Sequence, residues 1–240
     1  LNEHAKKTNA KIKTHLKIDT GMTRLGTHWN NCQETINEWQ NSELVKEGVY
    51  SHFANSNTTH ELNASQLTRF NNETQPLTGL IKHFSNSDSI THIKDAHFNL
   101  VRVGLNAYQN SFTLSAPIRQ IQTVPKGTPI GYGSTYTTDE ACQIAIIGMG
   151  YADGLSTQLS NNGYVAIQND HYPIIGKICM DMFMVKLPKE TSISSTDTVI
   201  ILSPDHRPGM SLEEMATKTQ QNPREVMTRL SQRITRQPLT

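Results

Sequence analysis

The sequence is poor in cysteine, carries almost no net charge and has no long hydrophobic run. Three cysteines, Cys32, Cys142 and Cys179, show no paired spacing in 240 residues, which excludes a disulfide framework and indicates reduced thiols in a cytoplasmic protein. The 22 Lys and Arg residues nearly balance the 21 Asp and Glu residues, so there is no basic face and nucleic acid is not an expected partner. No apolar stretch is long enough to span a bilayer, so we expect no membrane partner either.

The start of the sequence lacks an initiator methionine and any signal peptide. Residues 1–7 instead have the composition of a helix interior. We therefore expect the sequence to be the C-terminal portion of a longer protein whose first part lies upstream of Leu1. Hydrophobic residues make up 35% of the sequence, which is a low share for a compact domain and indicates a surface rich in Asn, Thr, Ser and Gln.

Short apolar strands alternate with helical segments over the first 110 residues. The predicted strands are Lys13–Asp19, Val45–Tyr50, Leu80–Phe84 and Phe98–Val103, and the predicted helices lie near residues 31–40 and 61–74. This alternation predicts a parallel α/β sheet with polar residues at the C-terminal ends of its strands, where α/β barrels place their chemistry. The segment offers four such units, whereas a closed barrel needs about eight.

After a predicted boundary near residue 110, the pattern over 111–240 becomes that of an all-β domain. It begins with a clean alternation at Phe112, Leu114, Ala116 and Ile118. Further strands are predicted near Cys142–Gly148, Tyr164–Gln168, Tyr172–Ile178, Phe183–Leu187 and Thr198–Leu202. A helical insert near the end carries two predicted capping boxes, Ser211–Glu214 and Asn222–Glu225, the second with proline at the first helical position.

One turn in the β domain is unusual because it combines three glycines with a tyrosine. The apolar strand that ends at Ile147 runs into Gly148–Gly154, with Tyr151 in the middle of the turn. Glycines allow positive φ and a close approach of the backbone to a partner, so the phenol is held where it can be aimed at a ligand. Taken alone, the same residue also fits an aromatic plug over the edge of a core.

Five motifs together resemble the alanine racemase family. They are His15–Gly26, Ser51–Ala54, Val101–Gly104, Gly150–Gly154 and Cys179–Asp181, and they occur in the family's order and spacing. Any one of them is weak evidence, whereas five in register over the whole chain are specific. The resemblance implies the second half of a (β/α)8-type barrel that binds pyridoxal 5'-phosphate (PLP), followed by the family's C-terminal β domain.

The resemblance also implies an activity. It points to a bacterial, cytoplasmic isomerase that interconverts L- and D-alanine with PLP, and without a metal, to supply D-alanine for peptidoglycan. The enzyme would be a homodimer with an active site shared between subunits, in which Met180 and Asp181 line the opposite subunit's substrate pocket. Tyr151 matches the family's catalytic tyrosine, the acid and base on one face of the substrate α-carbon. A phenol that works near neutral pH needs positive charge close by, and His52 and Arg102 match the residues that provide it.

The remaining matched residues concern the cofactor and the substrate. Arg102 matches the arginine at the cofactor's pyridine nitrogen, and Arg24 matches the one that reaches the cofactor's phenolic oxygen and the substrate carboxylate. Lys17 occupies a position that is a carbamylated lysine in several members, where a carbamate would bind Arg24. Phosphate binding falls to Ser87 and to the backbone N–H groups of Gly104 and Leu105.

Two positions depart from the family's pattern. Gln232 stands where the family often has a tyrosine that contacts the phosphate. The family's PLP lysine lies in the first barrel strand, and no lysine here has a matching context; Lys82 and Lys94 lack the surrounding motif. The sequence therefore predicts a chain that is inactive by itself.

Alternatives stay open for the function and for single residues. A racemase of the same fold with a broader substrate range would be distinguished by residues around Tyr136 and Met180–Phe183, and a non-catalytic fragment is the other alternative. Each site residue also has a plain structural interpretation: a hydrogen-bonded strand-end histidine for His52, a salt bridge for Arg102, a carboxylate partner for Lys17 and a buried thiol for Cys179.

Overall fold

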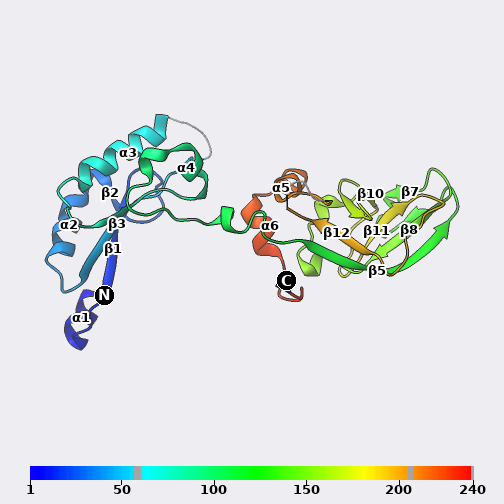
Figure 1. Cartoon of the computed structure of the whole chain (residues 1–240), viewed down its shortest axis with the longest axis horizontal. Coiled ribbons are helices and arrows are strands. Elements are labelled where there is room, and N and C mark those ends of the chain that lie inside the picture. Colours follow the sequence, from blue (N-terminus) through cyan, green and yellow to red (C-terminus); the bar gives the residue numbers. More distant parts are fainter. Residues whose placement is uncertain (57–60, 205–207, 239–240) are drawn as a thin grey trace. The chain divides into compact units, whose positions relative to one another are not determined.

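The computed structural model describes residues 1–56, 61–204 and 208–238; the last two residues of the predicted β domain therefore lie outside it. The chain divides into two compact units, Leu1–Ala107 and Tyr108–Thr240 (Figure 1). The first contains a parallel sheet with helices, and the second contains an antiparallel barrel. Among the described residues, no helix is long and apolar enough to cross a membrane.

The sheet of the first unit has four strands in the order β2-β1-β3-β4, and all neighbouring pairs are parallel. Its strands are β1 (Lys13–Asp19), β2 (Thr27–His28), β3 (Val45–Tyr50) and β4 (Ile81–His83). The predicted bounds of β1 and β3 are confirmed. The predicted third strand is confirmed with shorter ends.

The fourth predicted strand, Phe98–Val103, is wrong. The segment makes a single parallel bridge between Leu100 and His83 instead of a strand, and the fourth strand of the sheet is the two-residue β2. Phe98 has a φ of 46°, a left-handed conformation that interrupts an extended chain. The segment still lies beside the end of β4, because the Arg102 amide donates to the Ser85 carbonyl at 3.0 Å.

Helices cover the first unit's sheet and enclose an apolar core. They are α1 (Asn2–Thr8), α2 (Cys32–Gln40), α3 (Glu61–Thr74) and α4 (Ser87–His92), with the short 3-10 turns η1 (Trp29–Asn31), η2 (Lys94–Ala96) and η3 (Leu105–Ala107). The rings of Phe53 and Phe70 contact that of Phe84, with centroids 4.1 and 5.1 Å away. Each buried aromatic contributes about 1.5–3 kcal/mol, so this cluster anchors the helices to the sheet.

The second unit is a closed antiparallel barrel with the strand order β10-β11-β8-β5-β12-β9. These strands are β5 (Leu114–Val124), β8 (Cys142–Ile147), β9 (Tyr164–Ile167), β10 (Asp170–Ile175), β11 (Phe183–Leu187) and β12 (Thr198–Leu202), and a separate hairpin pairs β6 (Pro129–Ile130) with β7 (Tyr136–Thr137). The predicted alternation is confirmed, since Leu114, Ala116 and Ile118 are buried inside the barrel. Closure leaves no unpaired edge in this sheet.

The helical insert of the second unit comprises α5 (Leu212–Thr219) and α6 (Pro223–Arg229); the 3-10 turns are η4 (Tyr132–Ser134), η5 (Tyr151–Asp153) and η6 (Thr157–Leu159). Its two predicted capping boxes are half formed. The side chains of Ser211 and Asn222 accept backbone N–H groups at the starts of α5 and α6. The glutamates that would complete the boxes are bound elsewhere, Glu214 to the Tyr164 hydroxyl at 2.6 Å and Glu225 to Arg229 at 2.6 Å.

Candidate active site

Arg102 is the centre of a polar cluster in the first unit. Its Nη2 donates to the carbonyl oxygens of Ser51 at 2.8 Å and Phe84 at 3.0 Å, and to His52 Nδ1 at 3.1 Å. Its Nη1 donates to His83 Nδ1 at 2.6 Å. Carbonyls and imidazoles from the ends of two parallel strands thus fix the guanidinium at the C-terminal edge of the sheet. Burial lowers the pKa of Arg102.

The loop that carries His52 is hydrogen-bonded to a glutamine on α3 that sequence reasoning missed. Gln66 on α3 is fully buried, its Nε2 donates to the His52 carbonyl at 3.1 Å, and its Oε1 accepts from the Ala54 amide at 3.0 Å. An amide side chain can satisfy a donor and an acceptor at once, so Gln66 fixes the loop on both sides of Phe53. A polar residue on the apolar face of a predicted helix was the available signal.

The loop after β1 is organised by Asp19. Its Oδ1 accepts the backbone N–H groups of Gly21, Met22 and Thr23 at 2.9–3.1 Å, and its Oδ2 accepts that of Arg24 at 3.1 Å. Burial by itself would raise the pKa of Asp19, but these four donors outweigh it and lower the pKa. The loop therefore has a defined shape and presents the exposed Arg24 side chain.

Lys17 lies among other cations. Burial, followed by the charge of Arg24 and, after an opposing effect of Asp19, that of Arg102, lowers the pKa of Lys17. Its Nζ lies 5.6 Å from the centre of the Tyr50 ring. The backbone of Lys17 lies so close to Gly26 that position 26 has no room for a side chain, since an added Cβ would lie 2.8 Å from the Lys17 carbonyl oxygen.

The residues assigned to phosphate binding lie together. The Gly104 amide donates to Ser87 Oγ at 2.7 Å, and Leu105 opens the turn η3 immediately afterwards. The space beside Gly104 is open, because within 4 Å an added Cβ would meet Ser87 Oγ alone, at 3.4 Å. A hydroxyl and backbone N–H groups around open space are a donor set that fits an anion.

Tyr151 in the second unit is held by its backbone against the loop that contains Met180. The Tyr151 amide donates to the Cys179 carbonyl at 3.0 Å and the Ala152 amide to the Met180 carbonyl at 3.0 Å. Gly150 is required here, because an added Cβ would collide with the carbonyl oxygens of the same loop. The phenol remains 46% exposed and thus available to a ligand or a partner.

An arginine that sequence reasoning missed joins these two loops. Arg233 Nη2 lies 2.7 Å from Asp181 Oδ1, and its Nε lies 3.5 Å from Asp153 Oδ1. Asp153 Oδ2 in turn accepts the Gly150 amide at 3.0 Å. The Tyr151 turn and the Asp181 loop are therefore fixed to one another by both backbone and charge.

Two expectations about the residues near this loop need correction. Cys179 is partly exposed rather than a buried thiol, and its notable contact is the carbonyl that accepts from Tyr151. Phe183 is fully buried in the barrel and Tyr136 packs on an apolar cluster, so Met180, 54% exposed, is the better candidate for contact with a substrate. Gln232 is exposed.

The predicted site residues fall into two groups, one in each unit. The first unit contains Lys17, Arg24, His52, Ser87, Arg102, Gly104 and Leu105; the second contains Tyr151, Met180, Asp181 and Gln232. A parallel α/β sheet with cations and anion-binding donors at its C-terminal edge, followed by a β barrel that presents a tyrosine, defines the two-domain architecture of the fold-type III class.

Comparison with known proteins identifies the family. The family model described as "Alanine racemase, N-terminal domain" matches residues 1–111, and that of "Alanine racemase, C-terminal domain" matches residues 111–238. Alanine racemase 1 of Caldanaerobacter subterraneus subsp. tengcongensis is 32% identical over 98% of this chain and 66% of its own length; the Fusobacterium nucleatum alanine racemase is 35% identical over 95% and 68%. The crystal structure of Bartonella henselae alanine racemase with covalently bound pyridoxal phosphate has a TM-score of 0.85 and 28% identity, over 97% of this chain and 68% of that one.

The chain belongs to the alanine racemase family. It spans about two thirds of the length of the curated relatives it matches.

Proposed function

We propose that these residues form the larger part of a PLP-dependent alanine racemase, a cytoplasmic homodimer that interconverts L- and D-alanine for peptidoglycan synthesis. The observation that carries the proposal is the position of Arg102, held by four strand-end groups at the edge of the sheet. Family membership supports it, and so does the close association of Ser87 with Gly104.

The donor sets fit the cofactor at both of its ends. Ser87 and the backbone of Gly104 and Leu105 would hold the phosphate, since these groups donate hydrogen bonds and the space beside Gly104 is open. Arg102 would face the pyridine nitrogen. When bound, PLP supplies the electron-withdrawing ring that makes the α C–H bond of an amino acid acidic enough to break.

Arg102 would limit how strongly that ring withdraws electrons. A guanidinium donates a hydrogen bond but keeps its proton, so the pyridine nitrogen beside it stays unprotonated. With Arg102 in this position, more negative charge would stay on the substrate's α-carbon, where a proton donated by the protein could return quickly. This favours reprotonation at the same carbon, which is racemisation, over proton transfer elsewhere, which leads to transamination.

Proton transfer at the α-carbon would involve Tyr151 on one face. We propose that Tyr151, Met180 and Asp181 of one subunit act in the active site of the other, where Arg24 binds the substrate carboxylate. Lys17 would become carbamylated, since its lowered pKa increases the neutral amine that adds carbon dioxide. The resulting anion would orient Arg24.

The base on the opposite face would be a lysine that these residues do not supply. Lys82, a lysine on a strand, donates to the Thr74 carbonyl at 2.7 Å and is thereby turned away from such a role. We therefore expect the 240-residue chain mixed with PLP to form no D-alanine from L-alanine. Measurable D-alanine from the purified chain would contradict this part of the proposal.

The test of the function is a chimaera that places the N-terminal part of the Fusobacterium nucleatum enzyme before Leu1. With PLP it should convert L-alanine to D-alanine. Arg102→Met should lower the rate about 10²–10³-fold, the usual effect of losing a preorganised charge, whereas the exposed Arg236→Met should leave it unchanged.

Two results would contradict the proposal. A folded chimaera that binds PLP and leaves alanine unchanged would exclude alanine as the substrate, and faster turnover of other amino acids would indicate a broader racemase. An Arg102→Met chimaera with the full rate would show that the guanidinium does not face the ring. Arg102→Lys, which keeps the charge, tests the same point in a protein that folds more readily.

A further inference from the structure

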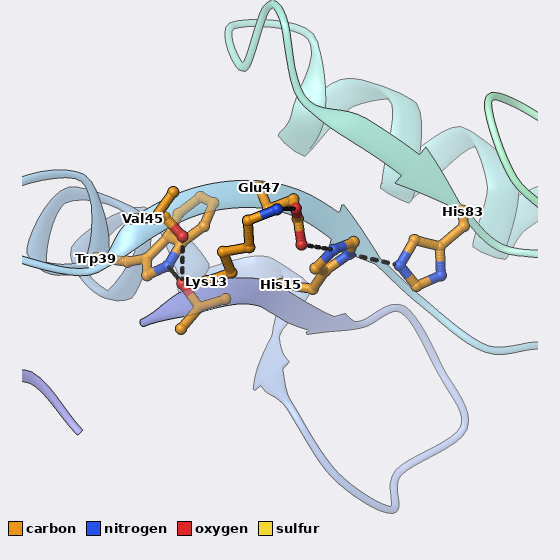
Figure 2. A network of polar contacts seen from close by, with 7 residues as sticks. Lys13, His15, Trp39, Val45, Glu47 and His83 are labelled. Atoms are coloured by element: carbon orange, nitrogen blue, oxygen red, sulfur yellow. Dashed lines mark hydrogen bonds and ion pairs between the residues drawn. The ribbon is translucent and has the colours of Figure 1, made fainter. Parts of the chain in front are cut away.

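A line of polar side chains continues from Arg102 through His83 across the sheet to the protein surface. Figure 2 shows the part of this line from His83 to Lys13. His83 at the end of β4 contacts His15 on β1, with Nε2 and Nδ1 2.8 Å apart. His15 Nε2 lies 3.3 Å from Glu47 Oε2 on β3, and Glu47 Oε1 lies 2.7 Å from Lys13 Nζ. Sequence reasoning assigned no role to His15, Glu47 or His83.

The strand between the two histidines has a glycine where a side chain would separate them. Gly48 of β3 pairs with both His15 of β1 and Ile81 of β4 in the parallel register. An added Cβ at Gly48 would collide with the His15 imidazole and with the Ile81 carbonyl. The sheet therefore makes room at this position for the ring of His15 to reach across β3.

The hydrogen bonds of this line can run in only one direction. A guanidinium has donors and no acceptor, so Nδ1 of His83 must accept from Arg102 and its ring proton lies on Nε2. That proton is donated to Nδ1 of His15, whose own proton then lies on Nε2 and is donated to the Glu47 carboxylate. A cation at one end and a carboxylate at the other thus favour the same tautomer in both rings.

The surroundings of His83 keep its ring neutral. Burial, followed by the charges of Arg102 and His15, lowers the pKa of His83 to about 4. Tyr50 stacks on the ring at a centroid distance of 4.8 Å, and Lys17 lies over Tyr50. A protonated His83 would have no acceptor for Arg102, so the neutral ring is the form that the line requires.

We propose that His15 and Glu47 are positioning residues, which accept and hold the Nε2 proton of His83 and thereby fix the His83 ring and the guanidinium of Arg102 where it faces the cofactor ring. The inference rests on the proposed function for the role of Arg102, but the tautomers themselves do not depend on the cofactor. A purely structural pair of histidines would tolerate either proton position.

The decisive experiment is a nitrogen NMR spectrum of the 240-residue chain labelled with ¹⁵N-histidine, recorded at neutral pH without cofactor. Both His15 and His83 should carry the proton on Nε2 and an unprotonated Nδ1. His15→Phe, which removes the acceptor and keeps a ring, should leave the His83 tautomer unchanged, because Arg102 still donates to Nδ1, but should speed exchange of the His83 Nε2 proton with solvent about tenfold, the effect of one lost hydrogen bond. Glu47→Gln should speed exchange of the His15 Nε2 proton in the same sense, because a neutral amide is a weaker acceptor than a carboxylate.

Lys13→Gln is the matched control. It removes the outer ion pair at an exposed position and leaves the three inner bonds in place, so both tautomers and the exchange rates of both Nε2 protons should be unchanged. In the active chimaera, His15→Phe and Glu47→Gln should lower kcat about tenfold, the effect of one orienting hydrogen bond, with a smaller change in KM. The Lys13→Gln chimaera should keep its kcat.

The results separate this inference from the proposed function. A proton on Nδ1 of His83 in the wild-type chain, or an unchanged exchange rate of the His83 Nε2 proton in His15→Phe, would overturn the inference even if the chimaera is an active racemase. If the chain shows the expected tautomers but the chimaera is inactive, the inference about the hydrogen-bond directions would stand and the proposed racemase function would be contradicted. Equal loss of kcat in Lys13→Gln and Glu47→Gln would also overturn it, since a surface effect would then explain both.

Discussion

The sheets of the two units differ in their edges: the parallel sheet of the first has two edge strands and the barrel of the second has none. The parallel sheet of the first unit ends in the short strands β2 and β4, whereas the barrel of the second unit closes on itself. Their interiors differ as well. Most of the described buried polar side chains, among them Thr20, Gln66, His83 and Ser87, belong to the first unit, and the barrel core is almost entirely apolar.

Under the proposed function, this contrast suits a division of tasks, with chemistry in the first unit and stability in the second. Polar groups inside the first unit satisfy one another and hold Arg102, an arrangement that fixes charges in place but contributes little net stability. Apolar side chains inside the barrel contribute most of its stability, and the second unit presents the exposed Tyr151 on a tightly fixed turn. The predictions below test that division.

The largest expected effect concerns the open edges. Unpaired N–H and C=O groups on edge strands associate with other chains, so the 240-residue chain should not be a well-behaved monomer. Under limited proteolysis, cuts should gather before Tyr108 and leave a resistant fragment that begins near Asn110. A chain that runs as a monomer in light scattering and resists protease equally in residues 1–105 would show that the first unit is a complete fold.

A cavity in the barrel should affect the second unit alone. Phe183→Ala removes a fully buried ring and should cost about 3–5 kcal/mol of the barrel's unfolding free energy. Urea unfolding followed by amide exchange should show the loss in β8 and β11 and none in β1 or β3. The exposed Tyr132→Ala is the control and should change neither unit. Equal losses in both units would mean that the two cores are one cooperative structure.

Removing the centre of the polar cluster should weaken the first unit alone. Arg102→Met leaves the Ser51 and Phe84 carbonyls without a donor, and an unsatisfied buried group costs about 1–3 kcal/mol. The same exchange experiment should show the loss in β3 and β4. If Arg102→Met raises the unfolding free energy of the first unit, the buried polar cluster destabilises that unit, and the account of it is wrong.

The first unit should also weaken when the pH falls from about 6.5 towards about 4. The pKa of His83 is lowered to about 4 in the folded protein, so between these values the unfolded chain binds the proton and the folded chain does not. The unfolding free energy of the first unit is highest above pH 6.5, where His83 is neutral in both states, and it decreases by about 1–2 kcal/mol at pH 5. His83→Phe should remove this dependence, which unfolding at pH 7 and pH 5 would measure.

The smallest expected effect is local to the helical insert. Asn222→Ala removes the side chain that accepts the Arg224 amide at 2.9 Å and should cost about 1 kcal/mol. Asn222→Gly should cost only a few tenths, because glycine tolerates the N-cap conformation. Thermal unfolding of both variants separates capping from packing. Equal losses would indicate that the side chain packs rather than caps.

Sequence patterns predicted the regular elements and missed what depends on pairing between strands. Val45–Tyr50 and Glu61–Thr74 have the predicted bounds. The prediction of a strand at Phe98–Val103 was wrong because an apolar run does not reveal the positive φ at Phe98. The β-strand β2 is too short to leave a pattern.

The same limit applies to the candidate site. Tyr151, His52 and Arg102 were found through motifs, each of which is local in the sequence. The line through His83, His15 and Glu47 was missed because it needs the register of three parallel strands, which a single sequence does not provide. The available signals were Gly48 in a strand otherwise suited to larger residues and a histidine at the end of β4.

The central proposal is that the barrel unit of one subunit contributes a single catalytic group, Tyr151, to chemistry organised by the first unit of the other subunit. The direct measurement is deuterium incorporation at the α-carbon in heavy water, starting from L-alanine and separately from D-alanine, in the chimaera and its Tyr151→Phe variant. The account predicts a loss of about 10²–10⁴-fold for exchange that starts from L-alanine, a smaller loss from D-alanine, and no change in Tyr132→Phe. Unchanged incorporation from L-alanine in Tyr151→Phe would contradict it.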